Sequence, residues 1–315
     1  MSLIGLFKGA GPTGFGFNST AEDVTAGLDL KGKNYLLTGC SSGLGEETLR
    51  ALSMRGAHVI ATARKANAAK QSIARAGVAG AGAAAIECDL SSAASVRAAV
   101  DTVRAMGRPL DAVICNAGVM ALPAAERIHG IEAQFFINHI GHFILVTGLL
   151  DSLTKDGRVV VVSSGLHSSA PAAGIEFDDL GAERGYDPWK NYGHSKLANL
   201  LFARELGRRF EMTGRTANAL HPGVIRTNLG RHMSPVSRAA MRLAGPLFLK
   251  TIPQGAATTC YLAAHPDAWK YNGEYFVDCN PAESSSNGRD MEQAARLWSV
   301  SEEIAARVSQ AKSGA

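Results

Sequence analysis

Cysteine is scarce and irregularly spaced in this sequence. Five of the 315 residues are cysteines, and none forms a CxxC pair or stands beside histidine at the spacing of zinc ligands. The odd number and the spacing argue against both a disulfide framework and a metal site. We therefore expect reduced, mostly buried thiols at Cys40, Cys88, Cys115, Cys260 and Cys279.

Concentrated positive charge and long hydrophobic runs are also missing. Lys and Arg number 32 against 28 Asp and Glu, a net charge of +4, and no basic block suits a nucleic-acid backbone. The longest apolar runs, such as residues 143–146 and 159–162, are far shorter than the roughly 20 residues that span a bilayer. Residues 1–8 hold no apolar segment of signal-peptide length. The sequence therefore predicts a soluble cytoplasmic protein with no membrane anchor and no nucleic-acid partner.

Short apolar segments alternate with helical segments from residue 33 onward. The expected strands are 34–38, 58–62, 84–88, 112–115, 159–162 and 216–220. Fully apolar strands that alternate with helices are typical of a parallel sheet covered on both faces. We predict an α/β fold: a single-domain, Rossmann-type, doubly wound parallel sheet with helices on both faces and ligand chemistry at the carboxyl ends of its strands. The predicted divisions are an N-terminal arm over 1–31, the domain over 32–300, and a C-terminal helix or tail over 301–315.

A glycine-rich turn follows the first expected strand and opens the first expected helix, from about Glu46. Its spacing is G-x-x-x-G-x-G. Such a turn lets the backbone approach a pyrophosphate, which then meets the N–H groups and the positive end of the helix. An ordinary tight turn is the alternative interpretation. The predicted phosphate contacts are Gly39, Ser41, Ser42, Gly43, Leu44 and Gly45.

An acidic residue is missing where an NAD site would place one. That acid binds the ribose 2′-hydroxyl from the end of the second strand, about 20 residues after the glycines. Here residues 62–65 read Thr-Ala-Arg-Lys. Arg64, together with Lys65, can instead pair with a 2′-phosphate, and a charged hydrogen bond of roughly 1.5–3 kcal/mol favours NADP by roughly 10- to 150-fold. The alternative is an ordinary surface arginine.

Tyr192 and Lys196 stand four residues apart in an expected helix, so both side chains leave one face of it. A phenol has an ordinary pKa of about 10 and is a poor acid or base at neutral pH. A neighbouring ammonium and a cationic nicotinamide would both favour the phenolate. Lowering the pKa by three units requires roughly 4 kcal/mol, which two close cations can supply.

Several further motifs follow one another along the chain. They are the T-G-x-x-x-G-x-G turn, Asn116-Ala117-Gly118, Asn138, Ser163-Ser164, Tyr192 with Lys196, and His221-Pro222-Gly223. Together, from about residue 32 to 300, they resemble the short-chain dehydrogenase/reductase family. Residues 19–24, 138–143 and 192–199, with Leu297-Trp298, are similar to its retinol-dehydrogenase-like branch, which includes WW-domain oxidoreductases.

The resemblance implies four catalytic residues. Ser164 would hydrogen-bond the substrate oxygen and Tyr192 would move the proton. Lys196 would hold the ribose hydroxyls and tune Tyr192, while Asn138 would support a water relay to Lys196. Hydride would pass between the nicotinamide C4 and the substrate carbon, and donors placed where alkoxide charge develops would lower the barrier. Ser163 is the rival to Ser164.

The same resemblance implies further cofactor contacts. Beside Tyr192 and Lys196, they are Asp89 and Leu90 near adenine, Asn116, Ala117 and Gly118 along the ribose, and Pro222, Gly223, Ile225 and Thr227 near the carboxamide and phosphates. Asp89 has a helix N-cap as its alternative role, and Thr227 a water-bound loop hydroxyl. His139 and His142 stand three apart without a third ligand in view, so structural histidines are expected.

The substrate pocket would lie between residues 119–122, 166–189 and 228–249. The last segment has apolar residues at the spacing of an amphipathic helix, which suits either an apolar pocket wall or packing onto the domain.

The predicted function is an NADP(H)-dependent oxidoreductase that interconverts an alcohol and its aldehyde or ketone, with a hydrophobic or aromatic substrate and no metal. The alternatives are an NAD-dependent catabolic alcohol dehydrogenase and a nucleotide-sensing regulatory protein with little turnover. A homodimer is considered, because family members commonly dimerise through helical faces within about 133–153 and 192–212.

Overall fold

The sheet follows the predicted doubly wound topology. The computed structural model describes residues 8–77, 83–225 and 249–310. Eight strands are arranged in the order β10-β9-β8-β7-β4-β1-β2-β3, and every pairing except β10 with β9 is parallel. The strands are β1 (Asn34–Thr38), β2 (His58–Ala63), β3 (Ala83–Glu87), β4 (Leu110–Cys115), β7 (Leu153–Val162), β8 (Thr216–His221), β9 (Tyr275–Val277) and β10 (Asn280–Pro281).

The order of the strands reverses between β1 and β4. From β1 the chain proceeds outward through β2 and β3, then returns to β4 on the other side and continues through β7 and β8. In doubly wound sheets the crevice beyond the carboxyl ends of the strands, at such a reversal, is where ligands bind. The topology therefore points to the loops that follow β1, β4 and β7.

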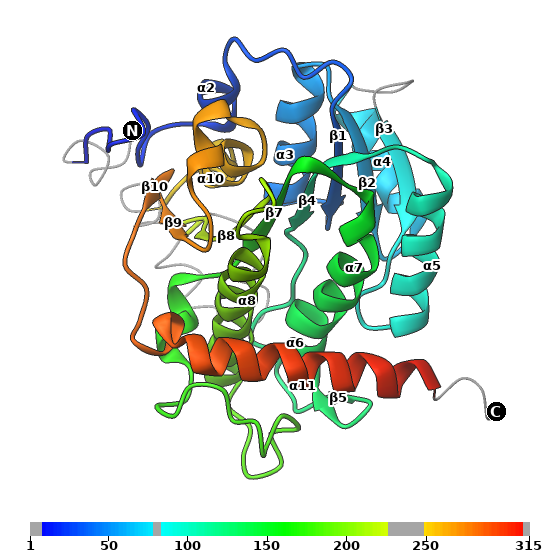
Figure 1. Ribbon diagram of the computed structural model, residues 1–315, viewed down its shortest axis with the longest axis vertical. Helices are drawn as coiled ribbons and strands as arrows, with labels where there is room; N and C mark the ends of the chain where they lie inside the picture. Colours follow the sequence, from blue (N-terminus) through cyan, green and yellow to red (C-terminus); the bar gives the residue numbers. More distant parts are fainter. Residues whose placement is uncertain (1–7, 78–82, 226–248, 311–315) are drawn as a thin grey trace.

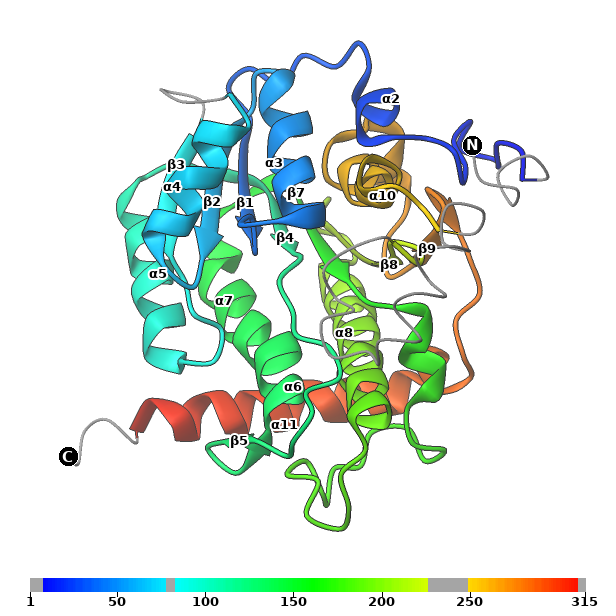
Figure 2. The ribbon, with the colours of Figure 1, turned by 180° about the vertical axis from the view of Figure 1, so that it is seen from behind.

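Helices cover both faces of the sheet (Figures 1 and 2). One face carries α2 (Ala21–Thr25), α3 (Gly43–Met54), α4 (Ala66–Arg75) and α10 (Ile252–Ala264). The other carries α5 (Ala93–Ala105), α6 (Ala133–Phe135), α7 (Gly141–Leu149), α8 (Pro188–Phe210) and α11 (Met291–Gln310). Shorter elements are the hairpin β5 (Arg127–Ile128) and β6 (Ile131–Glu132), a π-helical turn at Phe136–Ile140, and 3₁₀ turns at Leu150–Ser152, Gly165–Ser169, Pro266–Lys270 and Asn287–Arg289.

The apolar strands explain why this fold forms. All five residues of β1 are buried, and β7 is buried over its last four residues. A parallel strand between two helical layers has no solvent-facing side, so it is apolar throughout rather than alternating. β7 begins at Leu153, six residues before the predicted start, because Leu153 pairs with Leu110 ahead of a register shift in β4.

The N-terminal arm packs on the domain wherever the structure describes it. The backbone N–H and hydroxyl of Thr13 donate to the Asn280 side chain at 3.1 and 2.9 Å, and Asn280 donates to the Phe15 carbonyl at 2.9 Å. A capping box between Thr20 and Asp23 opens α2, which packs on α10. These contacts tie the arm to the β10 edge of the sheet.

The helix α11 runs across α8 in the lower part of Figure 1. Its Trp298 stacks on Phe202 with ring centroids 5.9 Å apart and meets Phe143 edge-on at 5.0 Å. The Arg209 guanidinium lies 4.0 Å from the Trp298 ring. The boundary predicted at residue 300 therefore falls inside one continuous helix. This helix also covers part of the helical faces within about 133–153 and 192–212, the faces considered for a homodimer.

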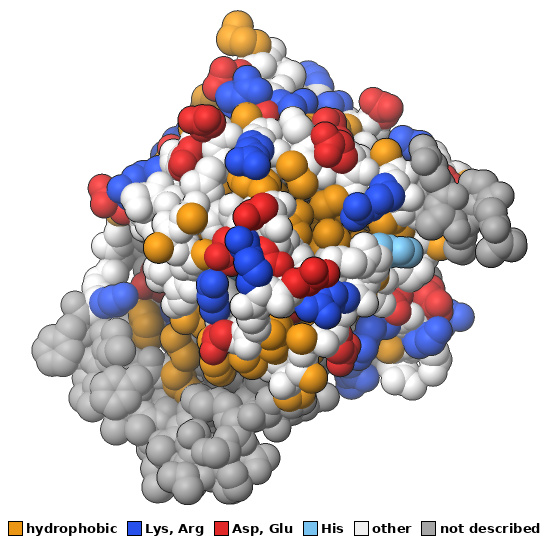
Figure 3. All heavy atoms as spheres, turned by 90° about the horizontal axis from the view of Figure 1, so that it is seen from below, with side chains coloured by type: hydrophobic (Ala, Val, Ile, Leu, Met, Phe, Trp, Pro, Cys, Tyr) orange, Lys and Arg blue, Asp and Glu red, His pale blue; other side chains and the backbone are white. Residues whose placement is uncertain are grey.

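One described stretch, Ala133–Ser152, is long and apolar enough by composition to cross a membrane, with a mean hydropathy of 1.4. Of that window, 78% is buried inside the protein. Core helices of globular proteins pass the same test, so the stretch is weak evidence for a membrane span. On the face shown in Figure 3, acidic and basic side chains are interspersed rather than separated by sign.

Candidate active site

The glycine-rich turn sits where β1 ends and α3 begins. Gly39 has a φ of +71°, and a Cβ atom there would lie 2.8 Å from the Ala117 Cα. A Cβ at Gly45 would lie 2.1 Å from the Gly39 carbonyl oxygen. The helix begins at Gly43, and its N-cap residue Ser42 makes no side-chain capping bond. The first turn of α3 therefore presents N–H groups that no capping side chain occupies, which suits an anion.

Arg75, a residue that the sequence analysis did not single out, braces this turn from α4. Its guanidinium donates to the Glu46 carboxylate at 2.6 Å and to the Ser41 carbonyl at 3.1 Å. The pair joins the first turn of α3 to the last residue of α4. No local motif marks this contact, because the two residues meet only after the sheet has formed.

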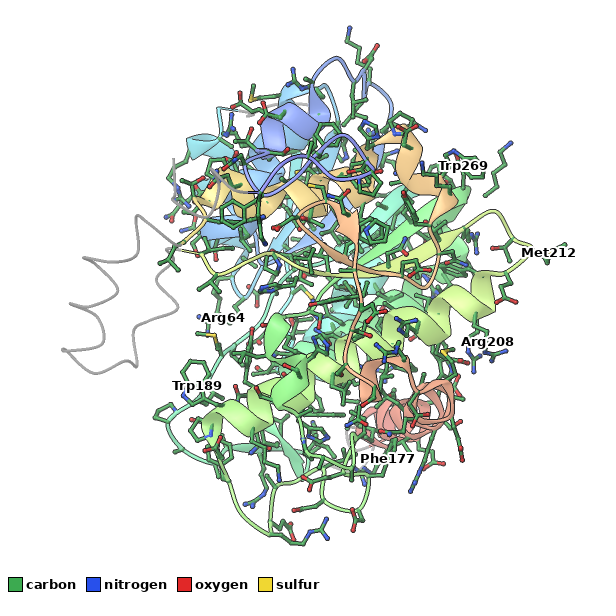
Figure 4. All side chains as sticks on the ribbon, turned by 90° about the vertical axis from the view of Figure 1, so that its left-hand side faces the viewer. Arg64, Phe177, Trp189, Arg208, Met212 and Trp269 are labelled. Atoms are coloured by element: carbon green, nitrogen blue, oxygen red, sulfur yellow. The ribbon has the colours of Figure 1, made fainter. Side chains whose placement is uncertain are left out.

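Arg64 and Lys65 lie at the end of β2 with exposed side chains. Lys65 forms an exposed ion pair with Glu87 at 3.5 Å. Within the described parts of the chain, Arg64 makes no hydrogen bond or ion pair, and Figure 4 shows it on the same side of the molecule as Trp189. Its guanidinium is therefore free to meet a ligand at this edge of the sheet.

The segment after β4 is held against the end of β1. The Thr38 hydroxyl oxygen accepts hydrogen bonds from the backbone N–H groups of Asn116 and Ala117, each at 3.0 Å. The Asn116 side chain donates to the Thr38 carbonyl at 2.9 Å. A Cβ at Gly118 would lie 3.0 Å from the Asn138 Oδ1 and 3.5 Å from the Lys196 Nζ. The turn therefore reaches the predicted catalytic residues.

Tyr192, Lys196 and Ser164 come together at the carboxyl edge of the sheet. Tyr192 and Lys196 leave the N-terminal half of α8, and Ser164 directly follows β7. All three are at least nine-tenths buried. The Lys196 Nζ donates to the Val162 carbonyl at 2.9 Å and lies 5.7 Å from the centroid of the Tyr192 ring. The three polar groups thus lie close together and are largely shielded from solvent.

Burial dominates the electrostatics of this cluster. It raises the pKa of Tyr192 to about 12, against an opposing effect of the Ser164 hydroxyl, and lowers the pKa of Lys196 to about 8. Removal of the phenolate from water is the main cause of the rise at Tyr192. The expectation that Lys196 and a cationic nicotinamide together favour the phenolate stays a prediction.

The two serines after β7 differ in what they contact. The Ser163 hydroxyl is fully buried and donates to the Lys196 carbonyl at 2.7 Å, which holds α8 against the sheet. The Ser164 oxygen accepts from the Leu166 N–H at 3.2 Å and faces Tyr192. The structure therefore brings Ser164, and not its rival, to the phenol.

Comparison with known proteins agrees with this geometry. Residues 33–176 match the family model for short chain dehydrogenases. The chain is 43% identical to the short-chain dehydrogenase TIC 32 B, chloroplastic, of Brassica napus, over 96% of this chain and 98% of that protein. It is 41% identical to retinol dehydrogenase 14 of Mus musculus, over 87% of this chain and 86% of that one. The chain belongs to the short-chain dehydrogenase family. Its relatives place it in the retinol-dehydrogenase-like branch of these oxidoreductases.

Solved structures share the fold. A protein from Mycobacterium paratuberculosis superposes with a TM-score of 0.73 at 32% identity, covering 90% of this chain and 96% of that one. A blue fluorescent protein from a metagenomic library, solved in complex with NADPH, gives a TM-score of 0.62 at 25% identity, covering 79% and 96%. The predicted fold class is confirmed.

The family's fourth predicted catalytic residue, Asn138, lies in the π-helical turn before α7. Its Oδ1 accepts from the Val119 N–H at 2.8 Å, and its Nδ2 donates to the Val119 carbonyl and to the Ser195 hydroxyl, both at 2.9 Å. The side-chain amide is thus committed to positioning its neighbours. The backbone carbonyl oxygen of Asn138 lies 2.9 Å from the His142 Nδ1, and a water relay to Lys196 stays a prediction.

The remaining predicted cofactor contacts of this dehydrogenase follow β3 and β8. Asp89 accepts from the Ser91 N–H and hydroxyl at 3.0 and 2.7 Å, whereas Ser92 is the N-cap of α5, so the N-cap interpretation of Asp89 is wrong. Leu90 is buried against Gly141. The turn after β8 contains Pro222 and Gly223, and Ile225 pairs with Lys250. Thr227 and residues 228–248 of the expected pocket segment lie outside the described residues.

A glutamine that the sequence analysis missed joins two expected walls of the substrate pocket. The Gln134 Oε1 accepts from the Ala121 N–H at 2.7 Å, and its Nε2 donates to the Tyr186 hydroxyl at 3.2 Å and to the Pro188 carbonyl at 3.1 Å. The Tyr186 hydroxyl in turn donates to the Leu122 carbonyl at 2.6 Å. The loop after β4 and the segment before α8 are therefore held in one fixed arrangement.

Proposed function

We propose that this short-chain dehydrogenase interconverts an alcohol and its aldehyde or ketone with NADP(H), using Tyr192 as the acid and base. The observation that carries the proposal is the burial of Tyr192, Lys196 and Ser164 together beside the glycine-rich turn. A proton donor, a cation and a hydroxyl around one volume are what a developing alkoxide requires.

The residues around the turn fit a nicotinamide dinucleotide. Gly39 lies too close to Ala117, and Gly45 too close to Gly39, for a Cβ atom at either glycine. With no side chains at these positions, the backbone of the turn is open to a ligand, and the first turn of α3 offers its N–H groups to a pyrophosphate. Lys196 would hold the ribose hydroxyls beside Gly118. When bound, the nicotinamide ring supplies or accepts the hydride at its C4 position.

NADP preference rests on Arg64. Its exposed guanidinium has no partner within the described residues, and the end of β2 carries no acid that would repel a 2′-phosphate. The NADPH complex of the metagenomic relative supports a phosphorylated cofactor in this fold.

The protonation states suit reduction of a carbonyl at neutral pH. Tyr192, whose pKa burial raises to about 12, holds the proton that an alkoxide oxygen would take. Ser164 can donate to the same oxygen, and Lys196 stabilises the phenolate that remains after the transfer. In the reverse direction the phenolate removes the proton from the alcohol.

A hydrophobic or aromatic substrate is supported by the rim of the site. The Trp189 side chain is 44% exposed at the start of α8, three residues before Tyr192. A large exposed ring one helical turn from the proton donor can stack on an apolar substrate. The relatives named as retinol dehydrogenases are consistent with a substrate of this class. A cytoplasmic location belongs to the same proposal.

The test is NADPH consumption against aldehydes and ketones that range from small aliphatic to retinal-sized carbonyls. Tyr192→Phe should bind NADPH as tightly as the wild type and lose at least about 100-fold in kcat. Tyr271→Phe, which removes a phenol on the opposite face of the sheet, is the matched control. Wild-type rates in Tyr192→Phe would refute the assignment of the acid. NADPH binding without turnover on any carbonyl would favour the nucleotide-sensing alternative.

A further inference from the structure

His142, in the first turn of α7, bridges two parts of the site that are far apart in the sequence. Its Nδ1 lies 2.9 Å from the backbone carbonyl oxygen of Asn138, and its Nε2 lies 2.9 Å from the Thr38 hydroxyl. The imidazole is fully buried, and Thr38 is almost fully buried. A buried polar ring is costly unless its nitrogens are hydrogen-bonded, and both nitrogens of this one are.

The partners fix the position of every proton in this bridge. A carbonyl oxygen only accepts, so the Nδ1 of His142 carries the hydrogen. The Nε2 of the neutral ring is then an acceptor, and the Thr38 hydroxyl donates to it. The Thr38 oxygen keeps its lone pairs for the N–H groups of Asn116 and Ala117. The Ile114 carbonyl, at 3.3 Å, is the longer alternative for the single hydroxyl proton.

The ring remains neutral over the working range of the protein. Burial and the charge of Lys196 lower its pKa to about 4, although the hydrogen bond to Asn138 opposes this. Protonation would place a second N–H opposite a hydroxyl that is already committed to two backbone donors. The arrangement therefore has one stable proton pattern rather than two.

We propose that His142 is a positioning residue that couples the cofactor turn to the catalytic turn of this dehydrogenase. On one side it holds the backbone of Asn138, whose amide positions Val119 and Ser195. On the other side it holds the hydroxyl that anchors the turn after β4. The inference rests on the proposed function, because it assigns His142 to the site that performs that reaction.

The neighbouring His139 has a different role, although the two histidines stand one turn apart. Its Nε2 meets the Ser301 hydroxyl of α11 at 2.8 Å, and its ring packs among Phe135, Phe143 and Phe202. The described residues contain no group of three or more metal-ligating side chains. His139 is equally buried, and within the described residues its side chain makes no hydrogen bond to the predicted catalytic residues, so it is a matched control.

The first experiment measures kcat and KM for His142→Leu and His139→Leu, with kcat normalised to the concentration of folded protein. His142→Leu fills the space but leaves the Asn138 carbonyl and the Thr38 hydroxyl without their partner, which should lower kcat at least about ten-fold. The KM for NADPH should change less than about three-fold. His142→Asn keeps a donor near the Nδ1 position and should recover part of the lost kcat, whereas His139→Leu should keep the wild-type kcat.

Two results would overturn the proposal. One is a His142→Leu variant with a kcat within about three-fold of the wild type, as expected of a merely structural core histidine. The other comes from ¹⁵N–¹H correlation spectra of the histidine side chains, in which the His142 signal is the one that disappears in His142→Leu. The bridge requires the ring hydrogen of His142 on Nδ1, and a hydrogen on Nε2 would contradict it. The spectrum needs no turnover, so it separates failure of this inference from failure of the proposed function.

Discussion

Buried neutral histidines make the stability of this dehydrogenase sensitive to mild acid. His139, His142 and His194 are at most 5% exposed, and burial lowers their pKa values to about 3, 4 and 4 from an ordinary 6.5. In the unfolded chain each of these rings binds a proton below pH 6.5, whereas in the folded protein none does until the pH is far lower. Their contribution to stability is therefore present above pH 6.5 and is lost as the pH falls toward the folded-state values.

The size of the loss follows from the gap between the two pKa values. Each buried ring lowers the free energy of unfolding by about 1.4 kcal/mol for every pH unit below 6.5, or by about 2 kcal/mol at pH 5. Three rings together lower the free energy of unfolding by about 6 kcal/mol between pH 7 and pH 5 as an upper estimate. Typical domains have only 5–15 kcal/mol of stability in total, so this loss is a large share of it. His167 and His221, whose pKa values are also lowered, add to the loss with the same sign.

The assay is urea unfolding followed by circular dichroism at pH values from about 7 to 5. His139→Asn should reduce the dependence of stability on pH by about a third, although it lowers stability at pH 7. The reasoning is refuted if the free energy of unfolding changes by less than about 1 kcal/mol over this range, or if His139→Asn keeps the full wild-type slope.

Further predictions concern the cofactor, the substrate and the C-terminal helix. Arg64→Ala should weaken NADPH binding by about 10- to 150-fold and leave NADH binding unchanged in a fluorescence titration. Lys70→Ala, at an exposed position of α4, is the control, and equal losses for both cofactors in Arg64→Ala would contradict the assignment. Trp189→Ala should raise the KM for bulky aromatic carbonyls by about three- to ten-fold and spare small aliphatic ones, and a uniform rise would argue against a stacking role. Trp298→Ala should destabilise the protein by about 3–5 kcal/mol in urea unfolding. Trp269→Ala, at a site that is 70% exposed, should cost far less, and equal costs would show that the packing on α8 is unimportant.

The parts of the fold that could be predicted are those encoded by local pattern. The strands could be predicted because a strand between two helical layers is buried on both sides and mostly apolar, as β1 is over Tyr35, Leu36 and Leu37. Tyr192 and Lys196 were found because a spacing of four on a helix brings two side chains to one face. The glycine-rich turn could be predicted from the spacing of its glycines. Gly39 and Gly45 permit contacts that a Cβ would block, and Gly43 has a φ of +60°.

The rest depends on contacts that exist only after folding. Arg75 reaches the glycine-rich turn from another helix, and Gln134 joins two loops, so neither has a signal in its own neighbourhood. The effect of burial on the pKa of Tyr192 could not be predicted, because the spacing of charges is visible in a sequence while the loss of solvent is not. The predicted boundary at residue 300 lies within α11, and the length of that helix was not evident from the local pattern either.

The aromatic seam between α11 and α8 has a consequence for biosynthesis. Phe143 and Phe202 are made well before Trp298, which is the residue that covers them. Until α11 has emerged from the ribosome, the helix that carries Tyr192 and Lys196 has an uncovered apolar flank, and partly synthesised chains are prone to association in such states. The core closes only once residues 291–310 have emerged, and a product truncated before Met291 would keep that flank exposed to chaperones and to other chains.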